Sequence, residues 1–339
     1  MNAPVEGRGV YLEAYLRPLA EWLERGDVTD ILVNAPGEVW IETVGGETQR
    51  HAAPELTDTA LWRLATQIAA AGHQGVNREH PLLAATLPDG SRVQIVAPPA
   101  TRGPMAIAIR KQVMADLGLE DYAGAGAFDG VRSVGLDGQS VEDSELDALL
   151  GEHRITEFLR TAVRARKNII VSGGTSTGKT TFLNALIKEI PRSERLIMIE
   201  DTPEVRLDHP NAVGLVAARG KLGEARVTVE DLLQAALRMR PDRIILGELR
   251  GPEAYSFLRA VNSGHPGSIT TVHADNPRAA VDQIALMVLQ AGANLGRSEI
   301  AEYVAGVVDV AVQLSRRDGR RMVSEIAFRP RSAVRSGAG

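Results

Sequence analysis

The sequence predicts an α/β protein with an N-terminal α+β domain, a long linker and a C-terminal P-loop domain built on a parallel sheet. At roughly 150 residues per domain, 339 residues correspond to about two domains. Helix and strand patterns are mixed in the first third, whereas short apolar strands alternate with helices in the second half. The expected boundaries are 1–111 for the first domain, 112–153 for the linker, 154–330 for the second domain and 331–339 for a polar, frayed tail.

The composition is that of a folded protein, with 44% hydrophobic and 24% charged residues. The chain contains no cysteine, which excludes disulfides, thiolate nucleophiles, iron–sulfur clusters and cysteine-ligated zinc and fits the cytoplasm. A net charge of -5 argues against a dedicated nucleic-acid binder. No apolar run approaches the roughly 18 residues of a membrane span, so we expect any membrane contact to be peripheral.

In the first domain, apolar residues at helical spacing predict a helix over 11–23, kinked or restarted at Pro18. A turn at Asn34–Gly37 predicts a hairpin of strands 31–33 and 38–43. Further along, the patterns predict a helix at 58–71 and strands at 83–87, 92–96 and 105–110. These elements make the domain α+β.

Beyond a linker with one short helix near 141–150, the second domain carries strands that are apolar almost throughout. They are expected at 168–172, 196–199, 244–246, 269–272 and 307–312. Such strands, alternating with helices, are typical of a parallel sheet covered on both faces.

The strongest motif is Gly173-Gly174-Thr175-Ser176-Thr177-Gly178-Lys179-Thr180, which matches the P-loop pattern G-x-x-x-x-G-K-[ST]. It follows an apolar strand and opens a predicted helix. Its glycines let successive backbone N–H groups face one anion, and the helix N-terminus adds its dipole. The motif places Lys179 at the β- and γ-phosphates of a nucleotide and the Thr180 hydroxyl on Mg²⁺.

Acidic residues end two strands beside the P-loop, where a P-loop enzyme needs carboxylates for metal and water. Glu248 ends the strand Arg243–Leu246 and is the Walker B candidate. The acidic pair Glu200-Asp201 ends the strand predicted at 196–199, and Glu200 is the candidate residue for activating water. His273 closes a further strand at the sheet edge where ligands bind, which suggests a γ-phosphate or interface role.

Four segments resemble, in order and spacing, the Walker A, Asp, Walker B and His boxes of the secretion ATPase superfamily. They are GGTSTGKT from Gly173, IEDTPE from Ile199, LRMRPDRIILGELRG from Leu237 and SGHPGSITTVHADNP from Ser263. The resemblance is strongest to the VirB-type traffic ATPases of type IV secretion and conjugation systems. PLLAATLPDGSRVQIVAPP and AIAIRK resemble the N-terminal domain of the same family.

The resemblance implies a homohexameric ring of N-terminal sensor-like domains stacked on RecA-like ATPase domains, with ATP and Mg²⁺ at their junction. By motif match, the catalytic residues would be Lys179, Glu200, Glu248 and His273, and the metal would be held by Thr180 and Glu248, partly through water. The nucleotide would contact Gly173, Gly174, Thr175, Ser176, Thr177, Gly178, Lys179, Thr180 and Thr181. Arg92 and Arg110 would reach the γ-phosphate. The long linker is similar to that of the subgroup in which the N-terminal domain packs on a neighbouring subunit.

The implied function is an ATP-driven motor for pilus assembly or for transfer of protein or DNA substrates. It would act at the cytoplasmic face of the inner membrane, with other secretion components as partners. A tight-adherence or type II-like pilus ATPase is the nearest alternative, although the absence of cysteine excludes the tetracysteine zinc insert of the extension type. A RecA-like DNA translocase would need a basic channel, and a P-loop regulator would bind nucleotide without turnover.

Overall fold

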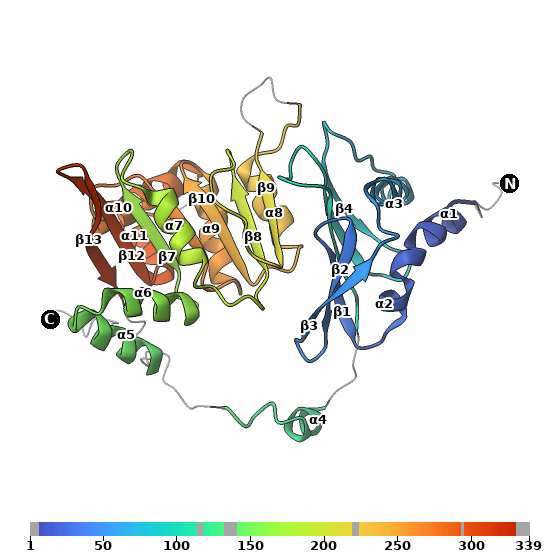
Figure 1. Ribbon diagram of the computed structural model, residues 1–339, viewed down its shortest axis with the longest axis horizontal. Coiled ribbons are helices and arrows are strands. Elements are labelled where there is room, and N and C mark those ends of the chain that lie inside the picture. Colours follow the sequence, from blue (N-terminus) through green and yellow to red (C-terminus); the bar gives the residue numbers. More distant parts are fainter. Residues whose placement is uncertain (1–6, 114–117, 132–140, 219–223, 293–294, 330–339) are drawn as a thin grey trace.

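Two β-sheets lying side by side organise the chain (Figure 1). The structure, a computed structural model, describes residues 7–113, 118–131, 141–218, 224–292 and 295–329. The predicted tail at 331–339 and parts of the predicted linker lie outside the described residues. Each of the two domains expected from the sequence is built around one of the sheets.

The N-terminal sheet is antiparallel, with strand order β3-β2-β1-β6-β5-β4. Its strands are β1 (Val28–Val33), β2 (Gly37–Thr43), β3 (Thr48–Ala53), β4 (Leu82–Thr86), β5 (Arg92–Val96) and β6 (Ala106–Arg110). The predicted hairpin is the β1–β2 pair, and the three later strands lie within one residue of the predicted bounds. The sequence analysis missed β3.

Helices cover one face of this sheet. They are α1 (Gly7–Leu16), the 3₁₀ turn η1 (Arg17–Leu19), α2 (Ala20–Glu24) and α3 (Asp58–Ala71). The helix predicted over 11–23 is interrupted at Pro18, as expected: α1 ends at Leu16, Pro18 lies in the 3₁₀ turn, and α2 restarts at Ala20, because proline cannot continue an α-helix. The side chain of Thr57 caps α3 by accepting a hydrogen bond from the Ala60 N–H at 3.2 Å.

The segment predicted as a linker contains α4 (Leu119–Gly124) and α5 (Val141–Gly151). The second of these packs against α6 (Ile155–Arg164), and its Leu146 and Leu149 are buried in the hydrophobic core of the second domain. Lys167 binds Asp143 on α5 at 2.6 Å. The last part of the predicted linker is therefore packed onto the second domain.

The C-terminal sheet has the strand order β13-β12-β7-β11-β10-β8-β9. Its strands are β7 (Ile169–Gly173), β8 (Leu196–Glu200), β9 (Ala212–Val216), β10 (Arg243–Leu249), β11 (Ile269–Val272), β12 (Val310–Arg317) and β13 (Arg320–Phe328). All neighbouring pairs are parallel except β12–β13. The prediction missed β9 and β13, and it began the 307–312 strand too early, because α11 ends at Val307.

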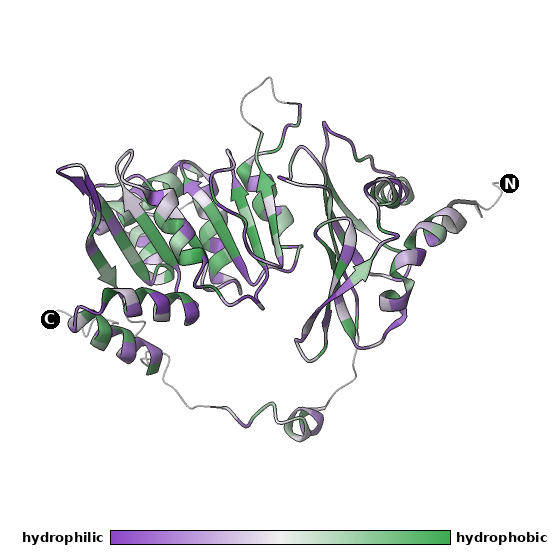
Figure 2. Ribbon diagram, in the orientation of Figure 1, coloured by the Kyte–Doolittle hydropathy of each residue, from purple (hydrophilic) through white to green (hydrophobic). Residues whose placement is uncertain are grey.

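Helices cover both faces of this sheet. Besides α5 and α6 they are α7 (Lys179–Ile187), α8 (Val229–Ala236), α9 (Glu253–Asn262), α10 (Pro277–Gln290) and α11 (Arg297–Val307). Ile169 and Val171 of β7 join the core with α5–α7, whereas Ile170 joins the core with α8–α11. The inner strands of the sheet, such as β7 and β8, are accordingly mostly hydrophobic, whereas the edge strand β13 begins with hydrophilic residues (Figure 2). Within the described ranges, each helix is too short or too polar to cross a lipid bilayer.

The two domains share a hydrophobic contact. Leu32, Ala106 and Ala108, on the sheet face opposite α1–α3, are buried in one cluster with Ile199 and Leu215 of the second domain. Small alanine side chains let the two sheets approach closely. Polar contacts surround this cluster, among them an ion pair between Arg240 and Glu42 and a hydrogen bond between Asn34 and Asn211 at 3.0 Å.

Candidate nucleotide-binding site

The P-loop connects β7 to α7 in a conformation that requires glycine at two positions. Gly178 has φ +93°, a left-handed conformation at the helix start. A Cβ on Gly173 would lie 2.5 Å from the Thr177 Oγ1 and 2.9 Å from the Leu314 carbonyl oxygen. The strand, loop and helix expected around the motif are therefore present, and packing fixes the path of the loop.

A pocket of about 410 Å³ opens beside the P-loop. It collects residues from the ends of β8, β10 and β11 and from the start of α7. Of the predicted site residues it is lined by Thr175, Ser176, Thr177, Gly178, Lys179, Thr180, Thr181, Glu200, Glu248 and His273. Lining residues not predicted as site residues are Asp201, Thr202, Glu204, Val205, Gly247, Arg250, Thr271 and Arg321. Gly173 and Gly174 shape the loop without lining the pocket.

Lys179 lines this pocket and contacts both the P-loop and the His box. Its Nζ donates to the carbonyl oxygens of Gly173 at 2.9 Å and Gly174 at 3.3 Å, and it lies 3.3 Å from the His273 Nδ1. Burial lowers the pKa of Lys179, and the Glu248 carboxylate opposes that change. The ammonium is thus held by backbone oxygens at the position where the motif requires a cation.

Glu248 joins the Walker B strand to the His box. Its Oε1 lies 2.8 Å from the Nε2 of His273, and its Oε2 accepts a hydrogen bond from Arg250 at 2.5 Å. Arg250 also binds Asp201 at 2.5 Å, so one guanidinium links the acids of two strands. The hydrogen bond to Glu248 raises the pKa of Arg250. The sequence analysis missed Arg250, although it follows Glu248 by two positions.

Oxygen ligands suitable for Mg²⁺ line the same pocket. The Thr180 hydroxyl and the Glu248 carboxylate both face it, and Mg²⁺ in phosphate sites is held by one or two such groups together with phosphates and water. The Thr180 Oγ1 donates to the Glu204 Oε2 at 3.1 Å. These residues fit the predicted metal, and Glu204, the last acid of IEDTPE, is a further oxygen donor that sequence reasoning missed.

Glu200 is buried in the wall of the pocket. Its Oε1 accepts hydrogen bonds from the backbone N–H groups of Glu204 at 3.0 Å and Val205 at 2.9 Å. Its other oxygen forms an ion pair with Arg102 of the N-terminal domain. Gly247 makes room for it, since a Cβ there would lie 2.8 Å from the Glu200 Cγ. Arg102 was not predicted, because nothing in its local sequence indicates so distant a partner.

An apolar pocket of about 290 Å³ adjoins the P-loop pocket. It is lined by Thr177, Gly178, Thr181, Phe182, Ala185, Leu314, Arg321, Met322 and Val323. Four of these residues, Thr177, Gly178, Thr181 and Arg321, line both pockets. A phosphate site and an apolar site thus share one wall.

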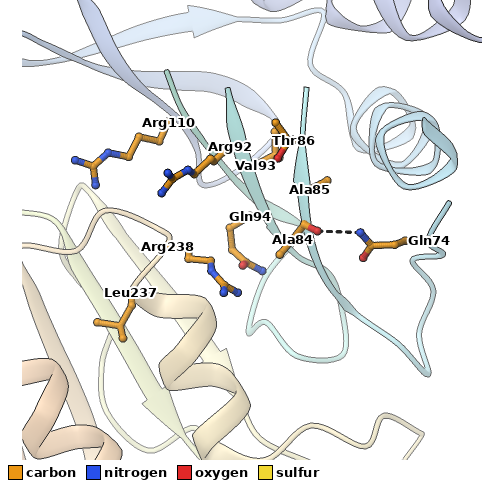
Figure 3. Close-up of a pocket in the computed structure, with 10 residues that line it drawn as sticks. All are labelled: Gln74, Ala84, Ala85, Thr86, Arg92, Val93, Gln94, Arg110, Leu237 and Arg238. Carbon is orange, nitrogen blue, oxygen red and sulfur yellow. Dashed lines mark hydrogen bonds between the residues drawn. The ribbon is translucent and has the colours of Figure 1, made fainter. Parts of the chain in front are cut away.

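Arg92 and Arg110 lie elsewhere in this chain. They are directly opposite each other on β5 and β6 and line a separate pocket of about 400 Å³, together with Arg238 (Figure 3). The pocket lies between strands β4–β6 and the end of α8, and its described lining contains no acidic side chain. The arginines that the resemblance assigns to the γ-phosphate are therefore not at the P-loop of their own chain.

Comparison with known proteins agrees with this geometry. Residues 14–322 match the model of the family described as Type II/IV secretion system protein. The type IV secretion system protein VirB11 of Brucella suis is 41% identical over 95% of this chain and 91% of its own length. The PtlH homolog of Bordetella bronchiseptica is 40% identical over 97% of this chain and 98% of its own.

A solved structure extends the agreement to three dimensions. The VirB11 ATPase of the Brucella suis type IV secretion system, determined with sulphate, matches with a TM-score of 0.88 and 39% identity over 95% of this chain and 98% of that one. The predicted fold, an N-terminal domain joined to a RecA-like ATPase domain, is confirmed. The predicted enzyme class, a P-loop ATPase, is confirmed as well. The chain belongs to the Type II/IV secretion system protein family.

Proposed function

We propose that this chain is the ATP-hydrolysing motor of a type IV secretion system, powering pilus assembly or the transfer of protein or DNA substrates. The observation that carries the proposal is the meeting of Lys179, Glu248 and His273 in one pocket, within a chain whose relatives are type IV secretion proteins. A cation, a carboxylate and an imidazole beside a P-loop are suited to phosphoryl transfer.

In this proposal the P-loop binds the phosphates of ATP. Backbone N–H groups of residues 174–178 and the N-terminus of α7 face the β-phosphate, and Lys179 exchanges its carbonyl partners for phosphate oxygens. The adjoining apolar pocket suits the flat, weakly polar adenine ring, with Phe182 and Val323 as contacts. This explains why the two pockets share a wall.

Hydrolysis follows from the groups around the γ-phosphate. Thr180 and Glu248 would hold Mg²⁺, which would neutralise charge on the phosphates. Glu200 orients and activates the attacking water, and His273, hydrogen-bonded to Glu248, contacts the γ-phosphate. All of the side chains given these roles line the described pocket.

We further propose a homohexameric ring, closed by a head-to-tail interface in which one surface meets a different surface of the next subunit. Arg92 and Arg110 would then contact the γ-phosphate of a nucleotide held by a neighbouring chain. Two like charges directly opposite each other destabilise a sheet unless an anion accompanies them, which supports this role. The ring would dock on other secretion components at the cytoplasmic face of the inner membrane, a peripheral contact.

The proposal is tested by measuring phosphate release and sedimentation of the full chain with and without Mg-ATP. We expect ATP turnover and a hexamer that is more stable with nucleotide. A monomer at micromolar protein with Mg-ATP would contradict the motor. Turnover that depends on added DNA would favour a DNA translocase instead.

A further inference from the structure

A loop of the N-terminal domain pairs with the edge strand of the ATPase sheet. The Val216 N–H donates to the Ala100 carbonyl at 2.9 Å, and the Arg102 N–H donates to the Gly214 carbonyl at 2.9 Å. Between these bonds, Thr101 and Leu215 form an antiparallel bridge. Because β9 ends the strand order, the N-terminal loop extends the ATPase sheet by a short backbone pairing.

This pairing aims Arg102 at the nucleotide pocket. The arginine side chain crosses β9 over Gly214, where a Cβ would lie 2.6 Å from the Arg102 Cδ. Its guanidinium then donates to the Val205 carbonyl and forms the ion pair with Glu200. The side chains of Arg102 and Glu200 are 14% and 3% exposed, so water is largely excluded from the pair.

A carboxylate this deeply buried needs a compensating cation. An isolated ionised carboxylate is costly in a low-dielectric interior, and the two backbone N–H groups on Oε1 leave its other oxygen without a partner inside the second domain. Arg102 supplies the charge and fixes the orientation of that oxygen. Without the arginine, Glu200 would turn away, take up a proton or admit water.

We propose that Arg102 is a positioning residue for ATP hydrolysis, holding Glu200 in the wall of the nucleotide pocket while its own domain is docked on β9. The inference rests on the proposed role of Glu200 in activating water. It differs from the proposed role of Arg92 and Arg110, because Arg102 acts within one chain and contacts a carboxylate rather than a phosphate. Turnover thereby depends on the docked position of the N-terminal domain.

The test compares steady-state kinetics of Arg102→Ala and Arg102→Lys with the wild type. Because Glu200 acts in the chemical step, we expect Arg102→Ala to lower kcat about tenfold or more while KM for ATP stays within about twofold. The lysine variant should recover part of kcat, because it restores the charge but not the guanidinium geometry.

Glu42→Gln is the matched control, since it removes an interdomain ion pair with Arg240 that lies outside the P-loop pocket. We expect its kcat to remain within about twofold of wild type, because Arg240 keeps its ion pair with Asp242 at 2.7 Å. Thermal unfolding of each variant shows that it is folded. If Arg102→Ala does not fold, Gly214→Ala displaces the arginine while keeping both charges, and its kcat should fall instead.

A double-mutant cycle separates positioning from general packing. In a Glu200→Gln background, Arg102→Ala should lower kcat by less than about twofold further, because the carboxylate it positions is already gone. An unchanged or raised kcat in Arg102→Ala, a lysine variant no better than alanine, or an equal loss in Glu42→Gln would overturn the inference. The proposed motor function would survive these outcomes as long as the wild type hydrolyses ATP.

Discussion

Arg243 and Glu194 form a buried, bidentate ion pair, in which Nε donates to Oε2 at 2.6 Å and Nη2 donates to Oε1 at 2.8 Å. The arginine opens β10, and the glutamate precedes β8 by two residues. These are the strands whose far ends carry Glu248 and Glu200. The pair therefore fixes the starting points of both acid-bearing strands, and with them the relative height of the two carboxylates.

We predict that Glu194→Gln destabilises the protein by about 3–5 kcal/mol, because Arg243 is fully buried and would lose its counter-charge. Urea unfolding of wild type and variant measures the difference. Arg78→Ala is the control, since its pair with Glu224 is exposed at the surface and should leave stability unchanged. Equal stabilities of wild type and Glu194→Gln would contradict the prediction.

The same pair predicts a pH dependence. Burial works to raise the pKa of Glu194, but the hydrogen bonds and charge of Arg243 hold that pKa below its usual value. A depressed folded-state pKa contributes stability above the unfolded value, about 4.3 for glutamate, and this contribution is lost as pH falls toward the folded value. Glu194→Gln should therefore lose less stability than wild type when the pH is lowered below about 4.3.

Lys179→Ala should abolish ATP turnover. The ammonium is held beside the P-loop carbonyls, and its charge at the transferring phosphoryl group lowers the barrier by several kcal/mol in enzymes of this kind. Phosphate release under saturating Mg-ATP measures the effect. A variant that unfolds at the wild-type temperature and keeps the wild-type kcat would remove Lys179 from the active site.

Glu248→Gln should bind ATP but stall before hydrolysis. The amide keeps the shape of the carboxylate and can still contact His273, yet it loses the charge that we propose binds Mg²⁺. Binding of a fluorescent ATP analogue, followed by a single-turnover experiment, separates the two steps. Normal hydrolysis by the variant would make Glu248 only a partner of Arg250.

Arg110→Ala should weaken ATP binding more than ADP binding and slow turnover tenfold or more, about 1.4 kcal/mol. Arg110→Lys should recover only part of the loss, because a guanidinium can make two contacts to phosphate oxygens and an ammonium cannot. The exposed Arg63 on α3 provides the control substitution to alanine. Unchanged ATP affinity and turnover in Arg110→Ala would contradict a contact between Arg110 and the γ-phosphate.

Most of the nucleotide pocket was predictable, because its chemistry is concentrated in short motifs. Lys179, Glu248 and His273 stand at strand ends or at the end of the P-loop, where the sequence pattern is local, and strands such as β7 begin with a continuous apolar run. The missed strands lack such patterns. Residues 48–53, TQRHAA, contain no hydrophobic alternation, and residues 212–216 form a run of five with a glycine inside.

The remaining site residues depend on contacts between distant segments. Arg102 lies in a proline- and glycine-rich turn, and only the docking of that turn on β9 brings it to Glu200. Arg92 and Arg110 lie on two strands that the sequence predicted, and these strands pair in the structure. Their pocket contains Arg238 because α8 of the other domain ends there, which no spacing along the chain could indicate.

The alanine-lined face shared by the two domains has a consequence for how the molecule can be divided. Leu32, Ala106 and Ala108 are buried among residues of the ATPase core, so the N-terminal sheet contributes one face of that core. Separately expressed halves would each expose an aggregation-prone apolar surface. The two pieces of a chain cleaved within residues 112–131 would instead stay associated. The two domains are therefore suited to reassembly from separate fragments, because they share one hydrophobic interface and are not independent units joined only by a linker.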